Sequence, residues 1–343
     1  MEQLSFFEAE RLLLPEIDSM LEKRLRILRA IHLAGTIGRR TLCEVVQMTE
    51  REVRNETDVL KRQNLILILQ KGMICTEQGY EVLEKLSALY HELSGLTQKE
   101  QRLAAHFGIE QVIVVAGDLQ KNANMLQLLG KEASSVLQRI AKPNSKIALT
   151  GGQSVAAVAP FLQNQKLHNP LFIPARGGIG EDIQYQANTL AAQFAQESNG
   201  QYRTLYTPEH LSEQTYLTMI HEPSVAAILS LYDEVNVVVH GIGAAEEMVV
   251  RRNSSAEIRE LLASRGAVGE SFGYYYDEQG NIVHHIRTIG IQLEQVQKSD
   301  KVIAIAGGAK KAKAIQAYFK NASPHTILIT DESAANAIIR QLS

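Results

Sequence analysis

The sequence predicts an α/β protein in which an N-terminal winged helix-turn-helix domain precedes a doubly wound, mostly parallel Rossmann-like domain. Three observations lead to this prediction. A length of 343 residues favours two domains. Several β-like runs in the C-terminal part are continuously apolar, as strands covered on both faces of a parallel sheet are. In the N-terminal part, short helical patterns precede two β-like runs joined by a Lys-Gly turn. Gly95 is the predicted boundary, which gives domains 1–95 and 96–343.

Composition limits the class of protein further. The chain is 45% apolar and 21% charged, with a net charge of -3, which is ordinary for a globular protein. No apolar run reaches the length of a membrane span, and the N-terminus is too acidic for a signal peptide. We therefore expect a cytoplasmic protein without a membrane partner. Cys43 and Cys75 have no metal-ligand spacing and suggest no disulfide framework, so we expect neither a metal nor a cofactor.

The first predicted elements are helical. Residues 1–16 form a short amphipathic stretch that either packs on the next helix or mediates self-association. From Ile17 to Leu33, apolar residues recur at helical spacing, and four basic residues lie largely on other faces. This pattern predicts a core-facing helix with a basic outer side, made of Lys23, Arg24, Arg26 and Arg29.

The next segment has the pattern of a helix-turn-helix. A short helix is predicted over Ile37–Gln47, and Thr49 with Glu52 has the spacing of a capping box that opens a third helix running to about Gln63. The apolar runs on either side of Lys71-Gly72 then predict a hairpin. The inner face of the third helix carries Val53, Thr57 and Leu60, and its outer face carries Arg51, Arg54, Asn55, Asp58 and Arg62.

Local charge indicates that this region binds DNA. Between Lys23 and Arg62, ten basic residues stand against five acidic ones in a protein that is net acidic. The alternative is a small helical protein-binding module with solvated arginines. In the DNA-binding interpretation, the third helix presents Arg51, Arg54 and Asn55 to the major groove, and Arg39 and Arg40 hold phosphates. The wing with Lys71 touches the DNA backbone or an adjacent groove, and Arg62 is a further DNA-binding candidate. A homodimer or homotetramer would bind paired half-sites of an operator.

A helix from Glu77 to Ser94 with an apolar seam follows, either as a connector or as a dimer helix. Beyond it, strands are predicted at seven places: Val112–Ala116, Lys146–Leu149, Leu171–Pro174, Tyr202–Tyr206, Asn236–His240, Lys301–Ala306 and Thr326–Thr330. The segment Phe272–Ile291 differs, because three tyrosines and a polar turn precede Ile282 and Val283. It predicts a hairpin or flap that covers a ligand.

The C-terminal ends of three of these strands predict an anion site. Thr150, Gly151 and Gly152 follow one strand, and Gln153 and Ser154 open a helix. Glycines let the backbone come close to a phosphate, while free helix N–H groups and hydroxyls donate to it. Similar glycine turns occur at 175–178 and 306–308. Because the carboxyl ends of parallel strands meet at one edge, all three turns are expected to face one crevice.

Four further side chains are candidates for this crevice, each with a structural alternative. Arg176 either clamps an oxyanion or forms a salt bridge that holds its loop. Lys311 adds a positive charge or is exposed on a helix. Gln186, with Asn188, reads sugar hydroxyls or caps the following helix. Glu270 accepts from a ligand hydroxyl or is solvated.

An enzyme is the main competing class. A sugar-phosphate isomerase or deaminase needs a general base and a proton shuttle, for which His240, Glu246 and Glu247 are the candidates. The segment Gly241-Ile242-Gly243 is too short for a dinucleotide fingerprint, and His240 has the position of a core histidine at a strand end. We therefore predict ligand binding without catalytic residues.

Longer motifs carry a family resemblance over nearly the whole chain. TGGQSVAAVA, FIPARGGIGEDIQYQANTLAA, VVVHGIG, VGESFGYYYDEQGNIVH and IAIAGGAKKAKAIQAYFKN, preceded by VLKRQNLI, resemble the SorC/DeoR-like family of bacterial sugar-phosphate-responsive repressors. The resemblance implies a winged helix joined to a non-catalytic domain similar to glucosamine-6-phosphate deaminase and ribose-5-phosphate isomerase. It also implies an operator of central glycolytic genes as the DNA partner and fructose-1,6-bisphosphate as the effector.

The resemblance also implies a set of ligand residues. Two positions depart from the family pattern: Gln153-Ser154 stands in place of two threonines, and Ala309-Lys310 in place of two serines. These departures bear on the ranking of phosphorylated ligands. The implied effector-binding residues are Thr150, Gly151, Gly152, Gln153, Ser154, Arg176, Gly177, Gly178, Gln186, Glu270 and Lys311.

Overall fold

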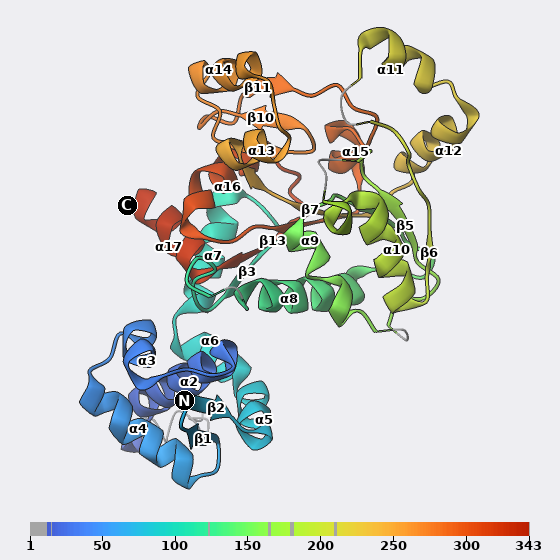
Figure 1. Cartoon of the computed structure of the whole chain (residues 1–343). Helices are drawn as coiled ribbons and strands as arrows, with labels where there is room; N and C mark the ends of the chain where they lie inside the picture. Colours follow the sequence, from blue (N-terminus) through green and yellow to red (C-terminus); the bar gives the residue numbers. More distant parts are fainter. Residues whose placement is uncertain are drawn as a thin grey trace, which may run out of the picture. The chain divides into compact units, whose positions relative to one another are not determined.

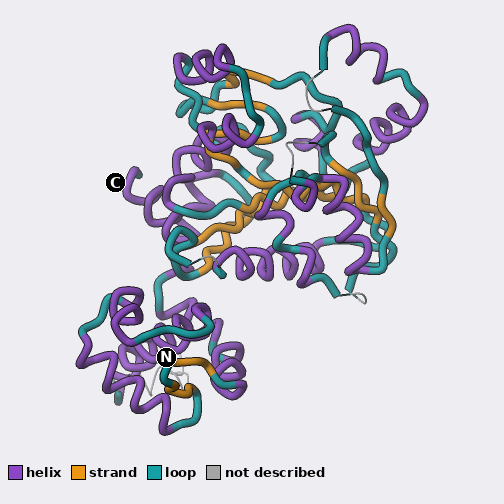
Figure 2. The backbone as a smooth tube through the Cα atoms, viewed as in Figure 1, coloured by secondary structure: helices purple, strands orange, loops and turns teal. Residues whose placement is uncertain are grey.

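The computed structural model describes residues 12–14, 16–122, 124–163, 166–178, 182–208 and 211–342. Most of the amphipathic stretch predicted at 1–16 lies outside these residues. The chain divides into two compact units between Gln98 and Lys99, three residues beyond the predicted boundary at Gly95. Each unit is described by itself below (Figures 1 and 2).

The N-terminal unit is a winged helix. Helices α2 (Glu16–Ala34), α3 (Arg39–Val46) and α4 (Glu50–Arg62) pack on one another, and the hairpin β1 (Ile66–Leu69) with β2 (Gly72–Cys75) follows. Met73 of the hairpin exchanges two backbone hydrogen bonds with Ile37, which adds a third, one-residue strand. The apolar core is made of Ile27, Leu28, Ile31, Leu42, Val46, Val53, Leu60, Ile66 and Met73.

Local sequence explains how α4 begins. Thr49 accepts from the Glu52 amide, and the Glu52 carboxylate accepts from the Thr49 amide at 3.0 Å, so the predicted capping box is confirmed. Gln47 ends α3 in the left-handed conformation at φ 54°, which turns the chain into α4. The single helix predicted over Glu77–Ser94 is wrong: α5 (Glu77–Lys85) ends at Leu86, and α6 (Ser87–Leu93) starts there. Neither glycine nor proline marks that break.

The C-terminal unit is built on a seven-stranded parallel sheet in the order β3-β13-β12-β7-β4-β5-β6. All seven predicted strands are present, although the predicted Tyr202–Tyr206 strand is reduced to two residues, Gln201–Tyr202. The strands are β3 (Gln111–Val115), β4 (Lys146–Leu149), β5 (Leu171–Pro174), β6 (Gln201–Tyr202), β7 (Val237–Gly241), β12 (Lys301–Ile305) and β13 (Thr326–Asp331).

The winding direction reverses between β4 and β7. From β4 the chain proceeds to β5 and β6, whereas from β7 it proceeds the other way to β12 and β13. Right-handed crossovers then place α8 (Met125–Ile140) and α10 (Ala187–Ser198) on one face of the sheet and α16 (Ala312–Phe319) on the other (Figure 1). Helix α17 (Glu332–Gln341), which follows the last strand, packs against α16. The reversal leaves an opening at the carboxyl ends of β4 and β7, where open α/β folds bind ligands.

A second, antiparallel sheet borders this opening. Its order is β11-β10-β9-β8, and the predicted hairpin of the Phe272–Ile291 segment is its β10–β11 pair. The strands are β8 (Gly243–Ala244), β9 (Gly269–Ser271), β10 (Tyr274–Tyr276) and β11 (Ile282–His285). Helix α7 (Leu96–Phe107) begins in the last residues of the N-terminal unit and continues into the C-terminal one. The other helices of the C-terminal unit are α9 (Gln153–Ala156), α11 (Glu213–Met219), α12 (Pro223–Tyr232), α13 (Ala245–Arg251), α14 (Ala256–Ser264) and α15 (Leu293–Lys298).

Candidate functional site

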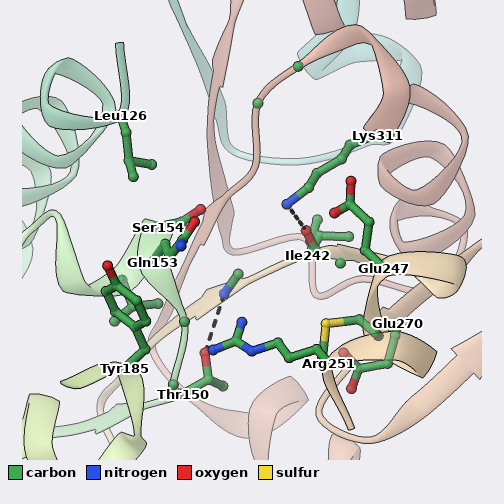
Figure 3. Close-up of a pocket in the computed structure, with 18 of the residues that line it drawn as sticks. Leu126, Thr150, Gln153, Ser154, Tyr185, Ile242, Glu247, Arg251, Glu270 and Lys311 are labelled. Atoms are coloured by element: carbon green, nitrogen blue, oxygen red, sulfur yellow. Dashed lines mark hydrogen bonds between the residues drawn. The ribbon is translucent and has the colours of Figure 1, made fainter. Parts of the chain in front are cut away.

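A pocket of about 680 Å³ opens at the reversal point of the sheet. Its walls come from three strand ends: residues 150–155 after β4, 241–243 at the end of β7, and 307–311 after β12. Figure 3 shows Gln153, Ser154, Lys311 and Arg251 around this space. Its size is that of a site for a small molecule.

The glycines of the first loop serve the protein backbone. A Cβ on Gly151 would lie 2.5 Å from the carbonyl oxygen of Tyr185, and Gly152 has φ +121°, which side chains rarely adopt. The Gly152 amide donates to the same Tyr185 oxygen at 2.8 Å. At Gly151 the missing Cβ therefore makes room for the 183–187 segment, while the role of both glycines in binding a ligand stays a prediction.

Thr150 joins two of the three loops. Its side chain is buried, and its hydroxyl oxygen accepts from the Gly241 amide at 3.3 Å (Figure 3). The hydroxyl proton is left to donate to another group. The side chains of Gln153 and Ser154, at the start of α9, also line the pocket.

A buried ionic cluster forms the floor of the pocket. Glu270 is 5% exposed; its Oε1 accepts from Arg252 Nη2 at 2.9 Å and lies 3.6 Å from Arg176 Nη1. Arg252 Nη1 also donates to the Tyr275 hydroxyl at 3.0 Å. Burial alone would raise the pKa of Glu270, but the two guanidinium groups outweigh it and hold that pKa below its usual value. Glu270 is thus ionised and buried, which excludes the solvated alternative.

Lysine and arginine side chains from other elements extend this positive region. Lys311 is half-buried, and its Nζ donates to the carbonyl oxygen of Ile242 at 3.1 Å. Burial lowers the pKa of Lys311, while Glu247 opposes that shift. Arg251, at the end of α13, extends toward Thr150, and its Nη1 lies 3.7 Å from the place of a Cβ on Gly152 (Figure 3). Lys311 therefore faces the pocket and is not the exposed helix lysine of the alternative prediction.

Most, but not all, of the expected ligand residues line the pocket. Gly177, Gly178 and Gln186 are not among the lining residues, and the Asn188 amide is fully engaged with the backbone of Leu205. A Cβ on Gly177 would lie 2.3 Å from the Thr207 carbonyl oxygen, so this glycine also serves packing. Gln186 occupies the N-cap position of α10 without a side-chain cap bond. The predicted residues that do line the pocket are Thr150, Gly151, Gly152, Gln153, Ser154, Arg176, Glu270 and Lys311.

Several lining residues were missed by the sequence analysis because the sequence carries little signal for them. Arg251 and Arg252 end a helix 10 residues beyond a strand end, and only the fold brings them to the floor. The loop after β3 and the start of α8 add Leu119, Gln120 and Leu126, which come from the edge of the sheet. The pair of adjacent arginines after GIGAAEEMVV is the one clue that a reader of the sequence could have used.

The candidate catalytic residues do not form a catalytic group. His240 is fully buried, with Nδ1 3.0 Å from the Ser271 hydroxyl, and burial lowers its pKa to about 4. Its ring packs against Phe272 and Tyr318, as expected for a core histidine. Glu247 lines the pocket beside Lys311, whereas Glu246 is not among the lining residues. The described residues contain no cluster of three or more potential metal ligands.

The winged helix exposes most of the side chains that were predicted to contact DNA. Val53, Thr57 and Leu60 are buried, as predicted, so α4 turns Arg51, Arg54 and Asn55 outward. Of the remaining predicted DNA contacts, Arg40, Arg62 and Lys71 are exposed and Arg39 is half-buried.

The basic outer side predicted for α2 is not a free positive surface. Arg24 donates to Glu56 at 2.7 Å, Lys23 lies 3.8 Å from Glu52, and Arg26 pairs with Glu22. These three basic side chains of α2 are therefore engaged in ion pairs. No helix in the described part of the chain is long and apolar enough to cross a membrane.

A winged helix followed by a ligand-binding α/β domain with no catalytic group in the described part of its pocket defines the class of ligand-controlled transcriptional regulators. Family comparisons agree with this class. Residues 20–90 match the CggR N-terminal DNA binding domain, and residues 91–340 match the family described as a putative sugar-binding domain. The chain belongs to this sugar-binding family of transcriptional regulators, and specifically to its central glycolytic genes regulator branch.

Two relatives of known name match nearly the whole chain. The central glycolytic genes regulator of Priestia megaterium is 41% identical over 99% of both chains, and that of Bacillus subtilis is 38% identical over 97% of this chain and 98% of the relative. A putative SorC family regulator from Enterococcus faecalis is 44% identical, with a TM-score of 0.67, over 71% of this chain and 99% of that structure. These relatives are regulators and not enzymes, so the isomerase or deaminase alternative is wrong.

Proposed function

We propose that the protein is a repressor of central glycolytic genes whose binding to operator DNA is controlled by a phosphorylated sugar, fructose-1,6-bisphosphate. The glycolytic target is suggested by the names of its two full-length relatives. The sugar-binding family match supports a carbohydrate ligand. The phosphate groups are suggested by the charge of the pocket.

That charge is the observation on which the proposal rests. Among the described residues that line the pocket, five are basic and three are acidic. At the floor, two buried guanidinium groups share the single carboxylate of Glu270. The planar guanidinium group of Arg176 lines the pocket, and such a group can bind a phosphate through two hydrogen bonds. The pocket volume has room for a hexose with two phosphates.

On the DNA side, α4 enters the major groove with Arg51, Arg54 and Asn55. Arg39, Arg40, Arg62 and Lys71 contact phosphates on either side of it. A homodimer or homotetramer presents two such helices to paired half-sites. The effector changes operator binding only if it has different affinities for the DNA-competent and DNA-incompetent states.

A thermal titration tests the effector assignment. The unfolding midpoint is measured against rising concentrations of fructose-1,6-bisphosphate, fructose-6-phosphate, glucose-6-phosphate and inorganic phosphate. A ligand that binds the folded state alone raises the midpoint with concentration, so the order of the four midpoints reports their affinities. We expect the bisphosphate to stabilise most. A midpoint that no sugar phosphate raises would exclude the proposed effector class.

A further inference from the structure

One wall of the pocket is formed by the loops after β3 and β12, which are distant from each other in the sequence. Leu119 and Gln120 follow β3, and Gly307 and Gly308 follow β12. A Cβ on Gly307 would lie 3.3 Å from Leu119 Cδ2, and one on Gly308 would lie 3.5 Å from Gln120 Cγ. The two loops therefore pack directly on each other, and their relative position sets the shape of this wall.

One buried carboxylate holds both loops. Asp331, the last residue of β13, is 0% exposed. Its Oδ2 accepts from the Leu119 amide at 2.7 Å, and its Oδ1 accepts from the Gly308 amide at 2.8 Å. The carboxylate thus bridges the loops after β3 and β12 from a position between them in the sheet.

Capping of α17 does not explain this arrangement. The Ala334 amide donates to Asp331 Oδ1 at 3.0 Å, which is the ordinary N-cap bond, and the Ser333 hydroxyl donates to Oδ2 at 2.9 Å. Serine or threonine would cap the helix equally well without a buried charge. Burying a carboxylate is unfavourable unless several donors satisfy it. Two of its four donors belong to the wall of the pocket, and each oxygen accepts from one loop amide as well as from one donor at the start of α17.

The loop after β12 also determines where the pocket's lysines lie. Gly308 has φ +94°, and Lys310 and Lys311 follow it within one turn. Because the Gly308 amide is fixed to Asp331, the backbone direction at this turn is fixed as well. Lys311 then reaches the carbonyl oxygen of Ile242, just after the end of the neighbouring strand β7. A change in the turn would move that ammonium group.

We propose that Asp331 is a positioning residue of the effector site: it orders the 117–122 and 307–311 loops so that the wall and Lys311 are in place before the ligand arrives. Asp331 does not line the pocket and does not touch the ligand. Preorganisation of this kind raises affinity because the ordering cost is not incurred on binding. The identity of the ligand in this inference rests on the proposed function. The ordering of the two loops by Asp331 rests on the loop geometry alone.

Three proteins test the proposal: the wild type, Asp331→Ser and Ser333→Ala. Serine keeps a cap for α17 but lacks the second oxygen and the reach to the loops, whereas Ser333→Ala removes one donor that belongs to neither loop. Amide hydrogen exchange is measured without ligand on peptides covering 117–122, 307–311 and α17. Affinities for fructose-1,6-bisphosphate and for inorganic phosphate are measured by calorimetry.

In Asp331→Ser, both loops should exchange at least about tenfold faster while α17 stays protected, and affinity for the bisphosphate should fall about tenfold. Ser333→Ala should match the wild type in both measurements.

Unchanged loop exchange in Asp331→Ser overturns the proposal, and so does a uniform loss of protection over the whole domain. If Asp331→Ser does not fold, hydrogen exchange of the wild type tests the proposal. The Gly308 and Leu119 amides should then be among its protected amides, and rapid exchange at both would overturn the proposal. Failure of both ligands to bind the wild type contradicts the proposed function instead, and the exchange of the loops still tests Asp331.

Discussion

Glu270 shows how a single residue controls both stability and charge at the site. It is the carboxylate of a buried cluster with Arg176 and Arg252, and its Oε1 also accepts from the Gly273 amide at 2.6 Å. Removing one partner of a buried ion pair leaves the other charges unsatisfied, which typically costs about 3 kcal/mol or more. We therefore expect Glu270→Gln to lower the free energy of unfolding by about 3 kcal/mol at pH 7.

The difference in unfolding free energy between wild type and Glu270→Gln should depend on pH in a way that is specific to the buried Glu270, Arg176 and Arg252 cluster. The folded-state pKa of Glu270 lies below its ordinary value of 4.5, so its contribution to stability is present above that value. The contribution is lost as pH falls through the lower, folded-state pKa. Urea unfolding from pH 7 to pH 3 should show a constant gap between wild type and Glu270→Gln down to about pH 5, and a narrowing gap below it.

Glu247→Gln is the matched control, because Glu247 lines the same pocket but is exposed. It should change the free energy of unfolding by no more than about 0.5 kcal/mol. A gap between wild type and Glu270→Gln that stays constant to pH 3 would contradict an ionised Glu270 in the folded protein.

Backbone conformation at Gly152 gives a second prediction at this scale. At φ +121° any side chain is strained, although the nearest atom to a Cβ is Arg251 Nη1 at 3.7 Å. Gly152→Ala should therefore destabilise by about 1–3 kcal/mol through strain and not through a clash. Gly241→Ala is the control: it also lines the pocket, its nearest neighbour is 3.7 Å away, and its φ is not in the left-handed region. Equal losses in the two variants, measured by thermal unfolding, would exclude backbone strain as the cause.

At the scale of secondary-structure elements, the sequence was informative where one local rule decides the outcome. The Thr49–Glu52 box and the continuously apolar strands were predicted because cap geometry and two-sided burial are recorded in adjacent residues. The break at Leu86 and the shortness of β6 were not, because tertiary packing decides them. The residues of the pocket divide in the same way into those that local sequence indicates and those that only tertiary packing brings there. Its glycine loops were visible in the sequence, whereas Arg251 and Arg252 reach it only through the path of α13.

The capping box makes a prediction for α4 as an element. Thr49→Ala removes the hydroxyl that accepts from the Glu52 amide, and loss of a threonine N-cap costs about 1 kcal/mol. The same change should weaken operator binding, because the first turn of α4 carries Arg51 and leads to Arg54. Thr49→Ser keeps an acceptor and should restore both properties. Circular dichroism melts and a fluorescence anisotropy titration with operator DNA measure them. If Thr49→Ser is as weak as Thr49→Ala, the cap is not the cause.

At the scale of the whole molecule, the proposed function requires that the two units can be impaired separately. The exposed basic residues of α4 lie in one unit, and the pocket lies entirely in the other. Arg54→Ala removes an exposed guanidinium and should weaken operator binding by about 1–3 kcal/mol, which is roughly 5- to 150-fold. It should leave the stabilisation by fructose-1,6-bisphosphate unchanged. Arg340→Ala, an exposed arginine of the other unit, is the matched control for charge and should change neither.

Lys311→Met is the converse variant. Methionine keeps most of the length of the side chain but removes the half-buried ammonium that faces the pocket. Loss of one charge-assisted contact to a phosphate should weaken effector binding by about 1.5–3 kcal/mol while operator binding without effector stays as in the wild type. The result expected is a repressor that needs much more sugar phosphate to respond. Calorimetry gives the effector affinity, and anisotropy with and without effector gives the operator affinity. If Lys311→Met and Arg54→Ala each reduced both affinities, the two activities would not reside in separate units and the proposed division of function would be wrong.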